Sequence, residues 1–90
     1  MPERVFIGLG SNLGDSIKTL QRAVDCIGQL SQTRLIRKSG LYISPAWGGI
    51  EQPDYINAVL EIETSLEPDA LLNELLAIER ENGRVRLNEL

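Results

Sequence analysis

The chain has 90 residues and a formal net charge of −4, from 13 acidic and nine basic side chains. A chain of this length forms one domain at most, and folding buries somewhat over ~60% of its unfolded surface. The acidic balance argues against a general nucleic-acid-binding protein. One cysteine and no histidine exclude an internal disulfide and a zinc site of the usual kind, so any metal would be a hard cation held by carboxylates.

The first predicted element is a strand in the apolar residues 5–7. A short apolar segment bounded by glycine is typical of a strand that is covered on both faces. The apolar run is too short to span a membrane, and the N-terminus lacks the residue order of a secretory signal. We therefore expect a cytoplasmic protein that does not act at a membrane.

The segment Gly-Leu-Gly-Ser-Asn-Leu-Gly-Asp at residues 8–15 follows this strand and has the composition of a phosphate-binding loop. It lacks the Gly-Lys-Ser/Thr of a Walker loop, and the third glycine of a dinucleotide fingerprint would fall one residue before Gly14. We therefore expect the glycines, Gly10 among them, to let the strand turn sharply into a helix. Ser11 and Asn12 are expected to bond backbone groups of neighbouring segments.

A helix is predicted from there to about residue 30. Asp15 or Ser16 is the expected N-cap. Apolar residues at spacings of three and four form one stripe, namely Ile17, Leu20, Val24 and Ile27. Cys26 lies beside that stripe and is interpreted as a packing residue.

Two strands are predicted next, over residues 33–42 and 55–64, with a loop at 44–54 between them. Gly40 is the expected site of a bulge in the first. The loop contains two prolines and two glycines, and its length suggests a function. In the second strand apolar and polar residues alternate. The inner face is predicted to hold Ile56, Ala58, Leu60 and Ile62, and the outer face Tyr55, Asn57, Glu61 and Glu63.

A second helix is predicted to begin at Pro68 and to end at Asn82-Gly83, with Leu71, Leu72, Leu75 and Ile78 on its inner face. The order is then β-α-β-β-α. This order favours an α+β, ferredoxin-like fold in which both helices cover one face of an antiparallel sheet. That topology needs one more strand, and we expect the chain to end before it.

Two groups of side chains could carry chemistry. Tyr55 and Asn57 share one face of a strand directly after the long loop, so a flat heterocycle could stack on the ring while the amide bonds its edge. They could equally be an outer-face polar pair without a ligand. Arg84 and Arg86, near Glu79 at the end of the second helix, could bind polyphosphate as paired forks or only complement the helix dipole. The remaining acidic residues are interpreted as a solvated surface, including Glu61, Glu63, Glu67 and Asp69.

Four short motifs occur in order across nearly the whole chain. They are residues 8–15, Tyr-Ile-Ser-Pro at 42–45, Gln-Pro-Asp-Tyr-Ile-Asn-Ala at 52–58, and Glu79 with Gly-Arg-Val-Arg at 83–86. Each motif is modest by itself. Together, at matching separations, they make the chain resemble the 6-hydroxymethyl-7,8-dihydropterin pyrophosphokinases of folate biosynthesis.

The resemblance implies a diphosphate transfer from ATP to the pterin hydroxymethyl oxygen, with Mg²⁺ in the full-length enzyme and AMP as the second product. It implies a pterin pocket lined by Ser44, Pro45, Trp47, Tyr55 and Asn57. It further implies that Glu79, Arg84 and Arg86 lie near ATP, and that Arg84 is the catalytic cation. Such a reaction needs in-line placement and cations far more than a strong base.

The end of the chain departs from the family pattern. After residues 83–86 the family continues through Arg-Trp-Gly-Pro-Arg to Leu-Asp-Leu-Asp-Ile, whose carboxylates hold two Mg²⁺ ions, whereas this chain ends in Leu-Asn-Glu-Leu. We therefore expect the first portion of a pyrophosphokinase, without metal ligands and with little or no transferase activity alone.

A second hypothesis comes from a different class of protein. A sheet that lacks its last strand leaves an unpaired edge, and such an edge tends to recruit another chain. The chain would then be a non-catalytic, ferredoxin-like binding or assembly module. This hypothesis predicts dimerisation through the unpaired edge.

Overall fold

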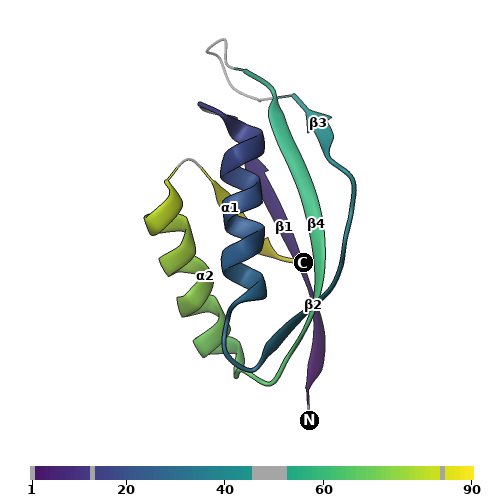
Figure 1. The fold of residues 1–90 in the computed structure, drawn as a ribbon, viewed down its shortest axis with the longest axis vertical. Helices are drawn as coiled ribbons and strands as arrows, with labels where there is room; N and C mark the ends of the chain where they lie inside the picture. The colour runs from purple at the N-terminus through teal and green to yellow at the C-terminus, as the bar shows by residue number, and fades with distance from the viewer. Residues whose placement is uncertain (1, 13, 46–52, 84) are drawn as a thin grey trace.

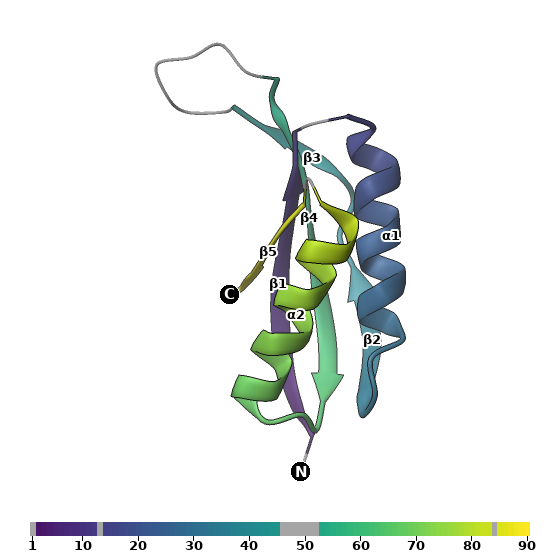
Figure 2. The ribbon, with the colours of Figure 1, turned by 90° about the vertical axis from the view of Figure 1, so that its left-hand side faces the viewer.

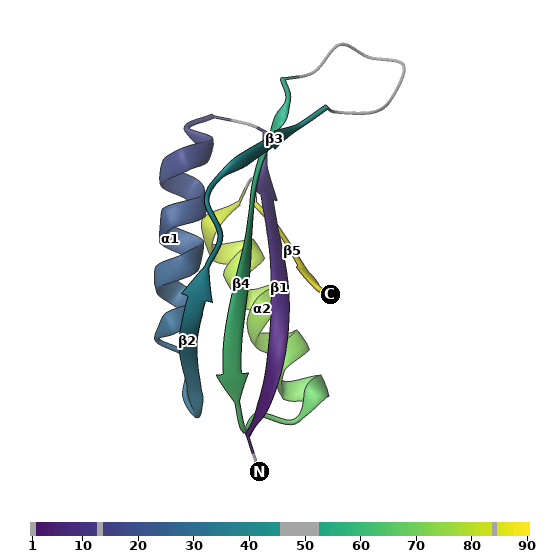
Figure 3. The same ribbon diagram turned by 90° about the vertical axis from the view of Figure 1, so that its right-hand side faces the viewer.

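The computed structural model describes residues 2–12, 14–45, 53–83 and 85–90 (Figure 1). Its elements are β1 (Glu3–Ser11), α1 (Ser16–Gly28), β2 (Thr33–Lys38), β3 (Tyr42–Ser44), β4 (Tyr55–Thr64), α2 (Pro68–Asn82) and β5 (Arg86–Glu89). The sheet has the order β2-β4-β1-β5, β3 also pairs with β4, and every pairing is antiparallel. Both helices lie on one face of the sheet (Figures 2 and 3). The predicted α+β, ferredoxin-like class is therefore confirmed.

The strand β5 corrects the expectation that the chain ends before the last strand of this topology. Residues 86–89 pair with residues 7–10 of β1, and the Leu90 N–H donates to the Phe6 carbonyl at 2.8 Å. The edge of β1 that was expected to be open is therefore occupied along these residues. Dimerisation through that edge stays a prediction, but it loses the observation that motivated it.

The predicted strand over residues 33–42 is in fact two short strands. The register against β4 slips by one residue between Leu35 and Arg37. It slips again farther on, because three residues separate Lys38 from Tyr42 while two separate their partners on β4. The second slip contains Gly40, as predicted, and the first was not foreseen. Each extra residue bends the strand.

The core lies between the helices and the covered face of the sheet. Its members are less than a tenth exposed and include Ile7, Leu9, Leu20, Ala23, Ile27, Leu60, Ile62, Leu71, Leu75 and Ile78. The predicted core is wrong at two positions, because Ile17 is 48% and Leu72 is 51% exposed. Cys26 packs against the core, as predicted. No helix within the described residues is long and apolar enough to cross a membrane.

The glycine segment turns as predicted at its last glycine, whereas Gly10 does not take part in the turn. Gly8 and Gly10 lie inside β1 and pair on both sides. The turn comes later, at Gly14, whose φ of 64° is in the left-handed region that favours glycine. Asp15 then caps α1, as predicted, by accepting a hydrogen bond from the Lys18 N–H at 3.2 Å.

The uncovered face of the sheet carries a buried charge that the sequence assigned to the solvated surface. The Glu61 carboxylate is only 4% exposed, and it accepts hydrogen bonds from Arg37 at 2.6 Å and from Arg4 at 3.2 Å. The bond from Arg37 lowers the pKa of Glu61 from its ordinary value of 4.5, against the opposing effect of burial, and the charge of Arg4 adds to the lowering. Neighbouring strands supply both cations, so a pattern along one strand could not reveal this site.

Candidate functional site

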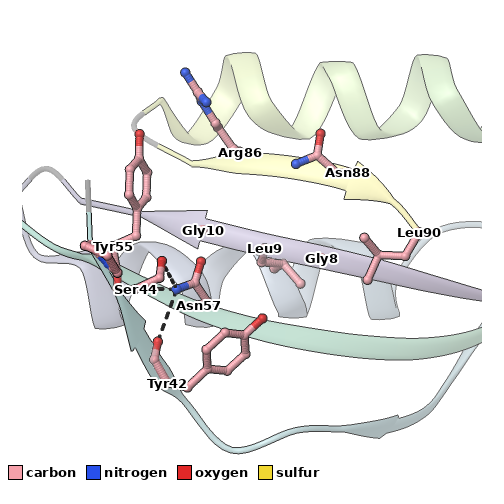
Figure 4. Close-up of a pocket in the computed structure, with 11 residues that line it drawn as sticks. Gly8, Leu9, Gly10, Tyr42, Ser44, Tyr55, Asn57, Arg86, Asn88 and Leu90 are labelled. Carbon is pink, nitrogen blue, oxygen red and sulfur yellow. Dashed lines mark hydrogen bonds between the residues drawn. The ribbon is translucent and has the colours of Figure 1, made fainter. Parts of the chain in front are cut away.

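A pocket of about 580 Å³ opens on the uncovered face, beside the C-terminal half of β1 (Figure 4). This volume lies within the range of small-molecule sites. The lining residues come from four strands, the start of one loop and the residue after β5, and they are Gly8, Leu9, Gly10, Tyr42, Ser44, Pro45, Tyr55, Asn57, Arg86, Asn88 and Leu90.

The two glycines of β1 form the floor of this pocket. Side chains alternate along a strand, so Ile7 and Leu9 enter the core while Gly8 and Gly10 face the opposite way. Gly10 lies between Asn57 of β4 and Arg86 of β5. A Cβ atom on Gly10 would lie 3.1 Å from the Asn57 Oδ1 atom, closer than ordinary packing allows. The absence of a side chain here makes the hollow.

The amide of Asn57 is fixed by the strand beside it. Its Nδ2 donates to the Ser44 Oγ at 2.8 Å and to the Tyr42 carbonyl at 3.3 Å, while its Oδ1 points toward Gly10 (Figure 4). No hydrogen bond within the described residues reaches this Oδ1. The side chain therefore offers a pre-oriented acceptor at the floor of the pocket.

Two tyrosines supply apolar surface to the pocket. Tyr55 precedes Asn57 by two residues, and its ring rises beside the end of β1, 3.6 Å from where a Gly10 Cβ would lie (Figure 4). Tyr42 of β3 pairs with Asn57 and is 50% exposed. A flat ring system could contact either aromatic side chain.

The opposite wall belongs to β5 and carries the charge. Arg86 and Asn88 lie directly across from Gly10 and Gly8, and their side chains are exposed. Arg86 forms no ion pair within the described part of the chain. It is also the one charged side chain among the described residues that line the pocket. This end of the site therefore favours an anion such as phosphate.

Of the residues predicted for the two binding sites, the structure brings Ser44, Pro45, Tyr55, Asn57 and Arg86 to this pocket. Trp47 and Arg84 lie outside the described residues.

Glu79 does not line the pocket. It is half-buried in the last turn of α2, where its Oε1 accepts a hydrogen bond from the Leu87 N–H at 2.8 Å. Its place near ATP was implied by the resemblance and stays a prediction, whereas its contact with Leu87 could not be foreseen because β5 was not predicted.

The residues after the glycine floor connect neighbouring segments. The Asn12 Nδ2 donates to the Pro53 carbonyl at 3.3 Å, so the end of β1 is tied to the segment that leads into β4. Ser11 is 1% exposed on the core side of the sheet. The bond of Asn12 to a backbone carbonyl is of the expected kind, and the supporting role of Ser11 stays a prediction.

The sequence interpretation missed Tyr42 and Asn88 as lining residues. The signal for Tyr42 was present in the sequence. Because side chains alternate along a strand, Tyr42 lies on the same face as Ser44, which was predicted to line the site. Asn88 gave no such signal, because its position depends on β5, which was not predicted.

The pocket offers no metal site from the described residues. None of its described lining residues is acidic. No group of three or more histidine, cysteine, aspartate or glutamate residues in the described ranges could hold a metal ion. The part of the site seen here is suited to binding a neutral ring and an anion.

The sequence matches the family model described as 7,8-dihydro-6-hydroxymethylpterin-pyrophosphokinase over residues 6–90. It is 51% identical over 82 residues to a 2-amino-4-hydroxy-6-hydroxymethyldihydropteridine pyrophosphokinase of Haemophilus influenzae, covering 91% of this chain and 51% of that protein. It is 45% identical over 86 residues to the protein of the same name from Pseudomonas aeruginosa, covering 96% and 53%. The chain thus spans about half the length of these curated relatives.

A solved structure, the Bacillus subtilis YXEP protein, a dinuclear metal-binding peptidase of the M20 family, has a similar fold. The match has a TM-score of 0.59 and 11% identity, and it covers 100% of this chain and 26% of that one. At this identity the likeness concerns the fold alone.

Proposed function

Because this chain belongs to the 7,8-dihydro-6-hydroxymethylpterin-pyrophosphokinase family, we propose that its glycine-floored pocket holds the pterin substrate of a diphosphate transfer from ATP. The observation that carries the proposal is the placement of the Asn57 acceptor and the Arg86 cation on opposite sides of Gly10. The reaction uses ATP and a small soluble substrate, so we propose that it takes place in the cytoplasm.

On the β4 side the pocket recognises the pterin ring. The ring of Tyr55 stacks on the heterocycle, for a contribution of roughly 0.5 to 1.5 kcal/mol. The Oδ1 of Asn57 accepts a hydrogen bond from an N–H at the edge of the pterin, and the bond to Ser44 holds the amide in that orientation. Pro45 lines the same end, and Trp47 is proposed as a further contact.

On the β5 side the pocket recognises phosphate. Arg86 faces the anionic substrate without an ion-pair partner among the described residues, and Arg84 precedes it by two residues. In the proposed reaction the pterin hydroxymethyl oxygen attacks the β-phosphorus of ATP, the bond from that phosphorus to the α-phosphate oxygen breaks, and AMP leaves. Arg84 is proposed to stabilise the charge on the transferred phosphoryl groups, because in-line displacement depends on positioned cations.

The described residues do not fit the magnesium ions that the resemblance implies, because no acidic side chain among them lines the pocket. The proposed tasks of this chain are therefore to bind and orient the pterin and to contribute cations. We accordingly propose that the 90-residue chain binds the pterin but has little transferase activity by itself. Incubation with ATP, magnesium and the hydroxymethylpterin should form no AMP above background, and turnover at ordinary enzyme rates would contradict this part of the proposal.

The binding itself is tested by calorimetric titration with 6-hydroxymethyl-7,8-dihydropterin. Asn57→Ala removes the acceptor at the floor, and we expect the dissociation constant to rise about tenfold or more. Tyr55→Leu should raise it about two- to tenfold. Asn73→Ala, at an exposed position on α2, is the matched control and should bind as the parent does. Equal affinity of the Asn57→Ala and Asn73→Ala variants would contradict the proposed site.

A further inference from the structure

The carboxylate of Glu79 contacts the backbone of the strand that forms the charged wall of the pocket. Its Oε1 accepts the Leu87 N–H at 2.8 Å. The Glu79 carbonyl also accepts the Gly83 N–H at 2.9 Å, which ends α2. One residue thus holds both the end of the helix and the strand that follows.

The register of β5 shows why this N–H needs a partner. The bond from the Leu90 N–H to the Phe6 carbonyl defines a hydrogen-bonded pair. Such pairs recur at every second residue of an antiparallel ladder, so Asn88 and Arg86 bond β1 while the Leu87 N–H points away from it. The strand has four residues and lies at the edge of the sheet. The Glu79 carboxylate is therefore the partner of an outward-facing edge amide.

Leu87 stands between Arg86 and Asn88, whose side chains form the wall above Gly10 and Gly8 (Figure 4). We propose that Glu79 is a positioning residue that holds β5 from its outer edge and thereby places Arg86 and Asn88 at the pocket. The consequence for ligand binding rests on the proposed function, whereas the effect on β5 can be measured without a ligand.

A change from glutamate to glutamine separates this role from a direct contact with a nucleotide. Glu79→Gln keeps an oxygen acceptor for the Leu87 N–H and removes the negative charge. Glu79→Ala removes both. A residue that acts through its hydrogen bond to Leu87 tolerates glutamine, whereas a residue that acts through its charge does not. Glu81→Ala, exposed at the end of the same helix, is the control for loss of a carboxylate.

The experiment compares the ¹⁵N-labelled parent chain and the three variants by NMR without ligand. Exchange of the Leu87 amide hydrogen should be accelerated at least about tenfold in Glu79→Ala, since a bond to a charged acceptor is lost. The cross-strand contacts of Arg86 with Gly10 and of Asn88 with Gly8 should weaken in the same variant. Glu79→Gln and Glu81→Ala should keep both signals, and the amide of Leu60 in the core reports whether each variant is folded.

Titration with 6-hydroxymethyl-7,8-dihydropterin and ATP then follows on the same samples. We expect weaker binding in Glu79→Ala and near-parental binding in Glu79→Gln. An unchanged Leu87 exchange rate in folded Glu79→Ala overturns the inference. So does equal loss of binding in both Glu79 variants while Leu87 stays protected in Glu79→Gln.

If the parent binds neither ligand, the proposed function fails, and the exchange rates still decide the role of Glu79. If Glu79→Ala does not fold, protected Leu87 and intact cross-strand contacts in Glu79→Gln support the inference, and their loss overturns it.

Discussion

The two halves of the uncovered sheet face share the strands β1 and β4 and differ sharply. At one end β1 presents Arg4 and Phe6, and this end, with Arg37 of β2, surrounds and satisfies the Glu61 carboxylate. At the other end β1 presents Gly8 and Gly10, and there the Asn57 acceptor and the Arg86 cation face an open hollow. We refer to these as the charged end and the pocket end.

The difference shows what the glycines contribute. Alternation places every second residue of β1 on this face in both halves, so the strand geometry is common to the two ends. Where β1 has side chains, the hollow is smaller, about 210 Å³, and the Glu61 carboxylate finds its partners within the chain. Where β1 has glycine, polar groups on the neighbouring strands remain available to a ligand. The glycine pattern thus sets where the sheet can bind something.

The largest expected effect comes from the core on which both ends depend. Leu60 is fully buried on the covered face of β4, so Leu60→Ala should lower the free energy of unfolding by about 2–5 kcal/mol. Val59→Ala, the neighbouring residue on the uncovered face, should cost about 1 kcal/mol or less. Urea unfolding of both variants measures the two losses of unfolding free energy. Equal losses would contradict the placement of Leu60 on the covered face and of Val59 on the uncovered face.

A methyl group on the pocket floor should weaken binding without weakening the fold. The Cβ of Gly10→Ala would lie 3.1 Å from the Asn57 Oδ1, so the amide must move, and we expect pterin affinity to fall about tenfold or more. Stability should stay level or rise by up to about 1 kcal/mol, because alanine suits a strand better than glycine. Gly28→Ala is the control, since its Cβ would meet nothing within 4 Å at an exposed position on α1, outside the pocket. Similar affinities for the two alanine variants would contradict the account of the floor.

The smallest expected effect is a change in acid sensitivity at the charged end. The pKa of Glu61 is lowered in the folded chain, first by the hydrogen bond from Arg37. The stability that this group contributes is therefore present above its ordinary value of 4.5 and is lost as the pH falls through the folded pKa. Glu61→Gln should unfold with a shallower dependence on pH below about 4.5. Urea midpoints across this range test the effect against Glu74→Gln, at an exposed position on α2. If the stability of Glu61→Gln depends on pH as that of the parent does, the ion pairs of Glu61 with Arg37 and Arg4 do not have the proposed effect.

Much of the fold was predictable because its signals are local. The alternation of residues 55–64 and the spacing of Leu71, Leu75 and Ile78 each follow from one element in isolation. The strand β5 was not predictable, since residues 86–89 contain one apolar side chain and owe their extended form to pairing with β1. The exposure of Leu72 also depends on how the helix is rotated against the sheet.

The residues of the candidate site that share one strand were also predictable from the sequence, whereas the contacts between strands were not. Tyr55 and Asn57 share a strand, so their common face could be inferred from alternation alone. The role of Gly10 as a floor could not be inferred, because it depends on which strands lie on either side of β1. For the same reason the partners of Glu61 and the contact of Glu79 with Leu87 emerge only from the assembled sheet.

The most direct test of the central claim is an NMR titration of the ¹⁵N-labelled chain with 6-hydroxymethyl-7,8-dihydropterin. We expect the largest shifts at Gly8, Gly10, Tyr55 and Asn57, and only small shifts of the amides of Arg4 and Glu61 at the charged end. Shifts centred on the charged end or on the helices, or no shifts at saturating ligand, would contradict the claim that the glycine floor of β1 creates the binding site.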